Sequence, residues 1–527
     1  MPARSAAQRA ASARGWRSEL PWVLTTLVAV LLVQLWAHEA PGFPFGSDWG
    51  QYLQGADALW RADDTASYPS WRGPLYMFLL GGPGQKLGYV VAGRLVSRVA
   101  AGLCVVAAAI AGRALGGRGA AAAAALMVAG FTPLQQAAVW VNPYASLGAA
   151  QGLCLAAGLA TARWGWRWSA AACGLLAAAA VATDPRGWMV VPIALVLGLL
   201  APAPRLRARR WASPALLFGF MALGLALALW VQRDLPHTPL GLAVQEQHVL
   251  SAEMVGMKTG PDHPLAACLE SDSNSARGDG RMVTTTACAR HLLAWNQGRM
   301  GPRGYVPPLW ALLVVLPMLL IPAPWGRRSS LASAAALGLP AVAMLAGLAW
   351  VEWAPRYSAP FVVPLALLGP VVASRLLARL PSAGLRAGLF WAAMAAWAWW
   401  AVPSHHGLQD RDPSLPDEGD LLDFAHWLDA EAGPEGLVLN CSQQPVDILL
   451  LPRPMQAAYP IAGSAERCQG WASQPPPAAG RRIFLTVHDP YTGACMGECA
   501  GLEPQHQGWL PLPLPTNAPP GVKGWTR

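Results

Sequence analysis

The sequence predicts an α-helical polytopic membrane protein with about eleven transmembrane helices and a small external α/β domain at its C-terminus. Three observations predict this class. Of the 527 residues, 54% are hydrophobic and only 13% are charged, about half the charged share of an ordinary soluble domain. The apolar residues gather in stretches of about 20 residues, the length that crosses a bilayer as a helix. Arginine is concentrated in alternate polar segments between those stretches.

Composition also excludes several classes of protein. A single soluble core is disfavoured because such cores stop growing near about 300 residues. The high apolar and low charged content excludes a soluble enzyme and a disordered or collagen-like chain. The net charge of +9 comes almost entirely from arginine. No basic stretch is interleaved with aromatic residues, so this charge does not indicate a nucleic-acid partner.

Eleven apolar stretches qualify as spans. The fifth and sixth are short and predict a helical hairpin broken at Asp184-Pro185, because proline cannot continue a helix. The transmembrane domain is expected at 1–403, with external loops at 38–87 and 232–306, and an external domain at 404–527. The spans are 21–37, 88–112, 119–139, 144–162, 169–183, 188–203, 213–231, 307–323, 331–350, 358–377 and 387–403.

The distribution of charge predicts the orientation. If the N-terminus is cytoplasmic and each span changes the side, the cytoplasmic segments hold 17 arginines and one acid, Glu19, while the other 28 of the 29 acids lie opposite. Basic residues stay on the cytoplasmic face during insertion, so the N-terminus is expected inside and the C-terminus outside. A signal peptide ending at Ala37-His38-Glu39-Ala40 is the alternative for the start, but the long apolar run favours a retained first helix.

The nine cysteines agree with that orientation. Three lie in spans and six in external segments, with even numbers in the long loop and in the tail, which is typical of disulfides in an oxidising compartment. We expect a disulfide between Cys268 and Cys288. The four tail cysteines leave three pairings open, and a zinc site at Cys495 and Cys499 is the alternative, although no companion pair of ligands is present. The tail cysteines are Cys441, Cys468, Cys495 and Cys499.

The first external segment contains the candidate catalytic carboxylate, Asp48, in the run Ser47-Asp48-Trp49-Gly50-Gln51-Tyr52. A carboxylate held near the interface and shielded from water can have a raised pKa and act as a general base. The alternative is structural. Ser47 or Asp48 could be the N-cap of a helix that runs through Leu53, Ala56 and Leu59, and the two roles are compatible.

Arginines near the same face are candidates for binding phosphate, because guanidinium binds phosphate through paired hydrogen bonds. Arg72 lies in the first external segment, and Arg94 lies in the outer part of the second span. Arg356, followed by Tyr357, lies between the ninth and tenth spans. The alternatives are snorkelling to the headgroups for Arg94 and interfacial anchoring with nearby aromatic residues for Arg356.

In their order, side of the membrane and spacing, these motifs resemble those of the GT-C superfamily of membrane glycosyltransferases, especially the bacterial branch akin to the aminoarabinose and protein mannosyl transferases. The likeness covers nearly the whole chain. The matching runs are Ser47-Asp48-Trp49-Gly50-Gln51-Tyr52-Leu53, Arg72-Gly73-Pro74-Leu75-Tyr76, Ala92-Gly93-Arg94-Leu95-Val96-Ser97, the turn from Arg113 to Arg118, Thr183-Asp184-Pro185-Arg186-Gly187 and Arg356-Tyr357-Ser358-Ala359-Pro360.

The resemblance implies an enzyme that transfers a sugar from a polyprenyl-phosphate donor to an envelope glycan, lipid or protein on the external, periplasmic face of the bacterial inner membrane. Asp48 would take the proton of the acceptor hydroxyl as that oxygen attacks the anomeric carbon, which would invert the centre. The arginines would stabilise the phosphate leaving group. No nucleotide is needed outside, in agreement with the absence of a P-loop or dinucleotide fingerprint. The expected substrate-binding residues are Arg72, Arg94, Arg356, Tyr357 and Tyr52.

The sequence departs from the family pattern in the loop after the third span. Many relatives carry a second acid there, where this chain has Asn142. A two-carboxylate metal site is therefore not supported, and a divalent metal stays an open question. Glu246 and His248 could supply ligands, but an exposed amphipathic helix explains them equally.

Two further function classes and one local alternative stay open at this point. A transporter is disfavoured because no span holds a carboxylate near its centre and no inverted repeat is visible. A non-catalytic envelope scaffold is compatible with the missing second acid. For Asp184 and Arg186, a local ion pair in a tight turn is the favoured interpretation over a functional pair.

The tail has the pattern of a small α/β domain. Helical spacing runs from Asp420 to Leu428, and 436–440 and 482–487 have the composition of short strands. Proline clusters at 475–477 and 511–520 predict loops. The tail could bind the acceptor or shield the site.

Overall fold

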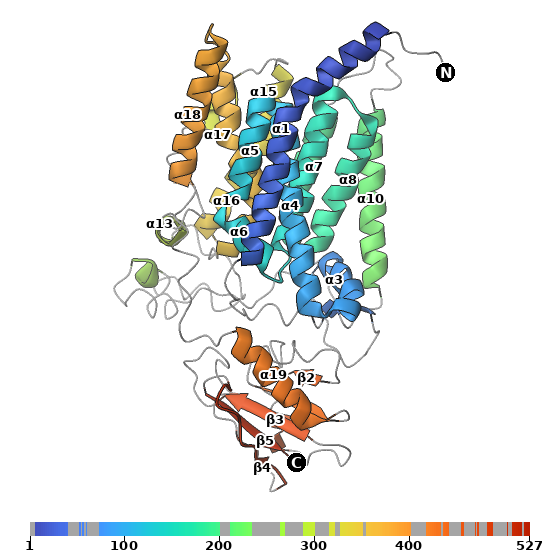
Figure 1. The fold of residues 1–527 in the computed structure, drawn as a ribbon, viewed down its shortest axis with the longest axis vertical. Coiled ribbons are helices and arrows are strands. Elements are labelled where there is room, and N and C mark those ends of the chain that lie inside the picture. The colour runs from blue at the N-terminus through green and yellow to red at the C-terminus, as the bar shows by residue number, and fades with distance from the viewer. Residues whose placement is uncertain are drawn as a thin grey trace.

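In the computed structural model, helices fill one elongated body, and a small sheet with one helix lies beyond one end of it (Figure 1). The structure describes residues 6–39, 52–53, 55–56, 59–60, 73–200, 211–233, 264–268, 288–300, 316–321, 327–350, 355–401, 418–433, 436–441, 455–457, 469–470, 472–473, 482–487, 503, 508–518 and 521–526.

Most helices of the elongated body coincide with predicted spans, but those at Pro74–Leu87 and Ala289–Met300 lie in the segments 38–87 and 232–306 that were predicted as external loops. The helices are α1 (Ala6–Glu39), α3 (Pro74–Leu87), α4 (Tyr89–Leu115), α5 (Arg118–Ala129), α6 (Thr132–Val139), α7 (Tyr144–Trp164), α8 (Arg167–Thr183), η1 (Pro185–Met189), α9 (Val190–Leu199), α10 (Ala212–Gln232), α13 (Ala289–Met300), α15 (Arg327–Ser333), the π-helical turn η4 (Ala334–Gly338), α16 (Leu339–Trp350), η5 (Pro355–Phe361), α17 (Val362–Leu377) and α18 (Ala383–Ala401).

Among the described residues, six helices are long and apolar enough to cross a membrane, or seven if α5 and α6, bent by 55°, form one span. Three of the remaining predicted spans coincide with the shorter apolar helices α8, η1–α9 and α18. These observations support a multi-pass helical membrane protein. The predicted span 307–323 lies mostly outside the described residues, so the number eleven stays a prediction.

The predicted break between the fifth and sixth spans is confirmed. α8 ends at Thr183, Asp184 is extended, and Pro185 starts the 3-10 turn η1, which leads into α9. Proline supports this geometry because its fixed φ suits a first helical position but its ring blocks a continuing helix. The break leaves a charged segment at one end of a hairpin of two apolar helices.

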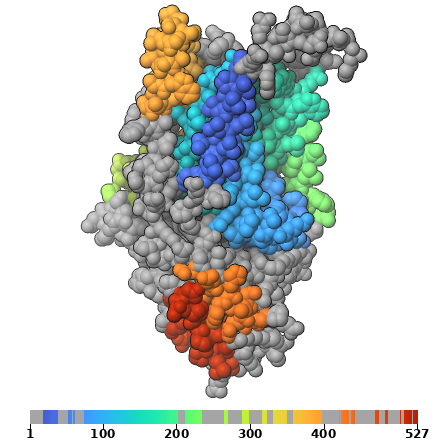
Figure 2. Space-filling view, viewed as in Figure 1, coloured from blue at the N-terminus to red at the C-terminus, as the bar shows by residue number. Residues whose placement is uncertain are grey.

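Small residues allow the central helices to approach one another closely. α4 packs against α1, α5, α7 and α17, and its contact face consists largely of fully buried alanines and glycines. Within a bilayer such contacts stabilise helix pairs through van der Waals packing. By contrast, α10 and the outer side of α1 carry exposed leucines; Figure 2 shows α1 along the surface of the body.

The arginines of three predicted cytoplasmic segments meet at one end of the body. Glu19 accepts hydrogen bonds from Arg113 (2.9 Å) and Arg118 (3.0 Å), and Arg163 donates to the carbonyl of Arg113 (2.7 Å). The part of α1 around Glu19, the turn between α4 and α5 and the end of α7 are therefore at the same end. The sheet lies beyond the opposite end (Figure 1), as the predicted orientation requires.

One buried arginine has a structural role that gives a stability prediction. Arg375 is 3% exposed and donates to the carbonyls of Leu319 (2.6 Å) and Ile321 (3.2 Å) and to the hydroxyl of Ser333. Replacing Arg375 by methionine is expected to lower the free energy of unfolding by about 2–4 kcal/mol, because several buried polar groups lose their partner. Thermal unfolding in detergent measures this, with the exposed Arg379→Met as the matched control. Equal melting temperatures for the two variants would contradict the assignment.

The tail has the predicted α/β character. Helix α19 (Glu418–Ala432) and strands β1 (Leu437–Asn440) and β3 (Arg482–Val487) confirm the three predicted elements. The sheet has the order β2-β1-β3-β5-β4, in which β1 pairs parallel with β2 and β3, and β5 pairs antiparallel with β3 and β4. The strands absent from the prediction are β2 (Met455–Ala457), β4 (Leu510–Pro511) and β5 (Val522–Thr526). β4 contains a proline from a cluster predicted as loop, which an edge strand tolerates.

The expected disulfide between Cys268 and Cys288 is present, with a Cα–Cα distance of 5.8 Å. Cys441 in the tail is also disulfide-bonded, to a partner outside the described residues. The three cysteines predicted to lie in spans, Cys104, Cys154 and Cys173, are free and buried. The distribution of oxidised and free cysteines thus follows the sequence-based division into external segments and spans.

Candidate functional site

The described part of the chain contains one arrangement suited to binding an anion beside the apolar body, and Arg186 is at its centre. The Arg186 guanidinium carbon lies 4.1 Å from the ring centroid of Tyr357 and 5.0 Å from that of Tyr144. The two rings meet edge to face at 5.7 Å. A guanidinium between aromatic faces is held by cation–π attraction while its N–H groups stay available for hydrogen bonds.

The break between α8 and η1 fixes the position of this arginine. Asp184 accepts a hydrogen bond from the backbone N–H of Arg186 (2.9 Å), and its carboxylate lies 3.4 Å from Arg186 Nε. Gln151 of α7 donates to the carbonyl of Arg186 at 3.3 Å. The local ion pair favoured from sequence is therefore present. It orients the guanidinium toward Tyr144 and Tyr357.

Two glycines allow the surrounding segments to approach the break. A Cβ atom at Gly73 would collide with the carbonyl of Ala182, and one at Gly187 would collide with the carbonyl of Ala180. Gly73 follows Arg72 directly and precedes α3. Gly73, from the predicted arginine–glycine–proline motif, is thus packed against the end of α8, beside the Asp184 break.

The loop between α6 and α7 completes the polar side of the site. Ser97 of α4 donates to the carbonyl of Trp140 at 2.7 Å, which fixes the loop against α4 one turn from Arg94. The Asn142 side-chain oxygen accepts from the backbone N–H of Tyr144, the first residue of α7. This loop therefore places the N-terminus of α7 beside the Arg186 guanidinium.

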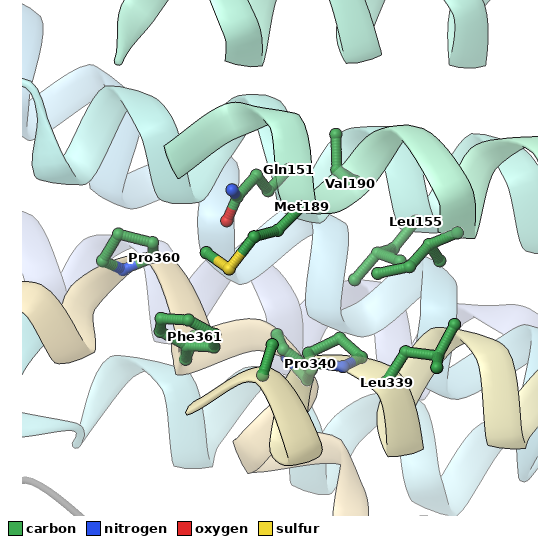
Figure 3. A pocket seen from close by; sticks show the side chains of 11 residues that line it. Gln151, Leu155, Met189, Val190, Leu339, Pro340, Pro360 and Phe361 are labelled. Atoms are coloured by element: carbon green, nitrogen blue, oxygen red, sulfur yellow. The ribbon is translucent and has the colours of Figure 1, made fainter. Parts of the chain in front are cut away.

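An apolar pocket adjoins the polar cluster. Gln151 and Met189 line it on the side of α7 and η1, and Leu339, Pro340 and Phe361 face them from α16 and η5 (Figure 3). Gln151 is the residue that holds the Arg186 carbonyl. The pocket thus begins where the polar cluster ends, and its remaining lining is apolar.

The predicted site residues are only partly among the described residues. Asp48 and Arg72 lie outside them, and Arg356 is described only as a backbone position in η5. Tyr357 lies in the site. Residues 52, 53, 55, 56, 59 and 60 are helical, as the N-cap alternative for Asp48 requires.

The two remaining predicted residues, Tyr52 and Arg94, are among the described residues. Tyr52 is 1% exposed and meets Tyr76 edge to face at 5.4 Å. Arg94 is half-buried on the first turns of α4. Arg98, one turn deeper, donates to the carbonyl of Ala37 at 2.9 Å. Its place in an apolar helix therefore has a structural reason, the capping of the end of α1.

Tyr144, Asn142 and Gln151 were not among the site residues predicted from the sequence, and Arg186 was predicted to have a local role. The signal for Arg186 was present, because a charged break between two apolar helices is rare without a function. For the other three, the residue types carry no signal by themselves. Among described residues no three His, Cys, Asp or Glu side chains gather, and Glu246, His248, Cys495 and Cys499 lie outside them.

Gly187 offers a test of how the break positions Arg186. Gly187→Ala is expected to displace η1 from α8, since the added carbon has no room beside the Ala180 carbonyl. We expect a lower melting temperature and a reduction of about tenfold or more in any activity that depends on the position of the Arg186 guanidinium. Gly219→Ala in α10, where no atom lies within 4 Å of the added carbon, is the matched control. Wild-type activity in the Gly187 variant would contradict this role.

Comparison with solved structures gives the same fold. ArnT from Cupriavidus metallidurans in the apo state has a TM-score of 0.57 at 13% identity, and 98% of each chain is covered. The same protein bound to undecaprenyl phosphate has a TM-score of 0.55 at 14% identity, over 96% of this chain and 98% of that one. An oligosaccharyltransferase from Archaeoglobus fulgidus, in complex with Zn and sulfate, has a TM-score of 0.52 at 16% identity, over 82% of this chain and 61% of that one.

Identities this low show the fold and leave the reaction to be inferred from the site. No protein-family model and no curated protein sequence matches the chain. The structural neighbours are membrane glycosyltransferases of the GT-C superfamily, the group that the sequence motifs resemble. The chain therefore has the fold of the GT-C membrane glycosyltransferases.

Proposed function

We propose that the protein is a membrane glycosyltransferase that moves a sugar from a polyprenyl-phosphate donor to an envelope glycan, lipid or protein. The observation that carries this proposal is the Arg186 guanidinium, held between Tyr144 and Tyr357 at the edge of an apolar pocket. A polyprenyl phosphate combines an anionic head with an apolar chain. A fixed cation adjoining an apolar pocket between membrane helices has the matching chemistry.

The chemistry follows from the charges that change during transfer. An acceptor hydroxyl oxygen forms a bond with the anomeric carbon while the bond from that carbon to the phosphate oxygen breaks. Asp48 takes the hydroxyl proton, and the phosphate leaves with the electron pair. One displacement of this kind inverts the anomeric centre, and a single base suffices.

Arg186 stabilises the negative charge that develops on the leaving phosphate, because a preorganised cation needs no reorganisation during the reaction. Arg72, Arg94 and Arg356 are proposed to share this role, with Tyr52 beside the acceptor and Tyr357 beside the phosphate. The packing of Gly73 against the end of α8 supports the placement of Arg72 near Arg186.

Fold and topology support the same proposal. ArnT, whose fold the chain shares, has been crystallised with undecaprenyl phosphate. We propose eleven spans in a bacterial inner membrane, with the N-terminus inside and the external domain 404–527 over a periplasmic site. The polar cluster lies at the ends of α8 and α7 opposite the Glu19–Arg113 pair, as this arrangement requires.

The proposal is tested by mass spectrometry of envelope glycans and lipids from cells with and without the gene. Loss of one sugar from one class of product, restored by the wild-type gene, is the expected result. Identical envelopes would contradict the enzyme and leave the scaffold hypothesis. Uptake or efflux of a solute that depends on the gene but not on Asp48 would favour a transporter.

A further inference from the structure

Asn142 has a buried side chain, and the two N–H bonds of its amide group make no hydrogen bond within the described part of the chain. The residue is 3% exposed. Its Nδ2 is inaccessible to solvent and has no hydrogen-bond partner among the residues that the structure describes. A buried amide group without an acceptor destabilises a protein by about 1–3 kcal/mol, so such a group in a native site calls for an acceptor supplied from elsewhere.

The orientation of the amide is determined by its neighbour. The Tyr144 N–H needs an acceptor, and Asn142 Oδ1 provides it at 3.0 Å. Exchanging the oxygen and nitrogen would set two donors against each other. The Asn142 carbonyl is therefore committed to the start of α7, and the group left over is the N–H₂.

A second buried donor lies against the same tyrosine. Arg186 stacks on the Tyr144 ring, and its Nη1 is inaccessible to solvent without a hydrogen-bond partner in the described ranges. Ser146, in the first turn of α7, has a buried hydroxyl that likewise has no partner there. The first N–H groups of a 21-residue helix also point toward this region. Asn142, which bonds to the Tyr144 N–H, and Arg186, which stacks on the Tyr144 ring, thus each bring to this tyrosine a buried donor without a partner among the described residues.

We infer that Asn142 is a substrate-binding residue, whose N–H₂ group donates, with Arg186 Nη1, to a phosphate oxygen of the polyprenyl-linked donor. This inference rests on the proposed function and deepens it. The Asn142 amide is neutral and donates N–H groups, whereas a carboxylate at this position would repel the phosphate. The phosphate is therefore bound through hydrogen bonds that the protein donates.

Two substitutions separate the amide donors of Asn142 from the side-chain oxygen that accepts from the Tyr144 N–H. Asn142→Asp retains an oxygen for the Tyr144 N–H and adds favourable charge at the helix N-terminus, but it replaces the N–H₂ group with a negative oxygen. Asn142→Ser retains a capping oxygen and removes the amide donors without adding charge. Asn142→Asp is expected to weaken binding about tenfold or more, and Asn142→Ser about three- to tenfold. Neither substitution is expected to lower the melting temperature substantially.

The measurement is the Kd of undecaprenyl phosphate for the full chain in nanodiscs, with undecaprenol and phosphatidic acid as comparison probes. Asn296→Ser is the matched control. Asn296 is fully buried like Asn142, but its Nδ2 donates to the Leu348 carbonyl at 2.8 Å. This control is expected to lower stability and leave the Kd unchanged.

The outcomes are distinguishable. Weaker binding in both Asn142 variants, with Asn296→Ser and undecaprenol binding unchanged, supports the inference. Wild-type Kd values in both Asn142 variants, with weaker binding in Arg186→Gln, overturn the role of Asn142 and leave the proposed function standing. A wild-type protein that binds undecaprenyl phosphate no more tightly than undecaprenol overturns both. If the Asn142 variants bind phosphatidic acid more weakly by the same factor, the N–H groups bind bilayer headgroups. That result overturns the assignment of these groups to the polyprenyl-phosphate sugar.

Discussion

Replacing Asp48 by asparagine is expected to reduce sugar transfer by about 10²–10⁴-fold, the range that a general base contributes. The asparagine has the same shape and can still cap a helix, so folding and donor binding should persist. A loss in kcat with little change in the Kd of undecaprenyl phosphate is the expected pattern, because the base acts on the acceptor proton during the chemical step.

The Asp48 experiment measures transfer of a labelled sugar by the purified protein, with expression and monodispersity checked for each variant. Asp423→Asn, at an exposed position on α19, is the matched control, since it makes the same chemical change in the external domain. If Asp48→Asn forms product at the wild-type rate, the proposed mechanism is wrong. If the two variants lose activity equally, the loss reflects general damage and not the removal of a base.

Replacing Arg186 by glutamine is expected to lower kcat by about 10²-fold or more, because it removes a preorganised cation from the leaving phosphate. Binding of undecaprenyl phosphate should weaken as well, since charge-assisted hydrogen bonds are stronger than neutral ones. Arg186→Lys is expected to recover part of both losses. A lysine keeps the charge but lacks the planar fork and the stacking between Tyr144 and Tyr357.

The matched control for this arginine is Arg233→Gln. Arg233 is exposed and lies over the Trp230 ring at 4.9 Å, so the variant removes another guanidinium that is stacked on an aromatic ring. Steady-state transfer and donor Kd are measured for all three variants. A lysine variant as impaired as the glutamine variant would point to shape and not charge. A fully active glutamine variant would remove Arg186 from the mechanism.

The distribution of apolar residues was sufficient to predict the location of most helices. The break at Asp184-Pro185 and the end of each helix pair depend on local properties, such as proline's fixed φ and the left-handed backbone that Gly165 adopts after α7. The Cys268–Cys288 disulfide followed from counting cysteines by compartment. The short strands β2, β4 and β5 were not predicted, because two to five residues with proline or glycine nearby carry too little periodicity.

The site was harder to predict than the fold. Tyr357 was named from its motif, and the charged break containing Arg186 was noted but given a local role. The contribution of Tyr144 and Asn142 depends on which helix end meets which turn. An asparagine before a proline is also a common helix-capping residue, so its unused amide donors become visible only once its surroundings are known.

The sequence by itself determined that this chain spans a membrane, where its apolar helices lie, which segments carry charge, and which cysteines pair in the long loop. These properties depend on residue composition over short stretches of the chain, and the thickness of the bilayer sets the length of each apolar helix. The tertiary structure alone decided that η1, the start of α7 and η5 meet, so that one guanidinium lies between two tyrosines that are 213 residues apart in the chain. The reason is that this meeting depends on close packing between helices, at positions such as Gly73 and Gly187 where only a missing side chain leaves room.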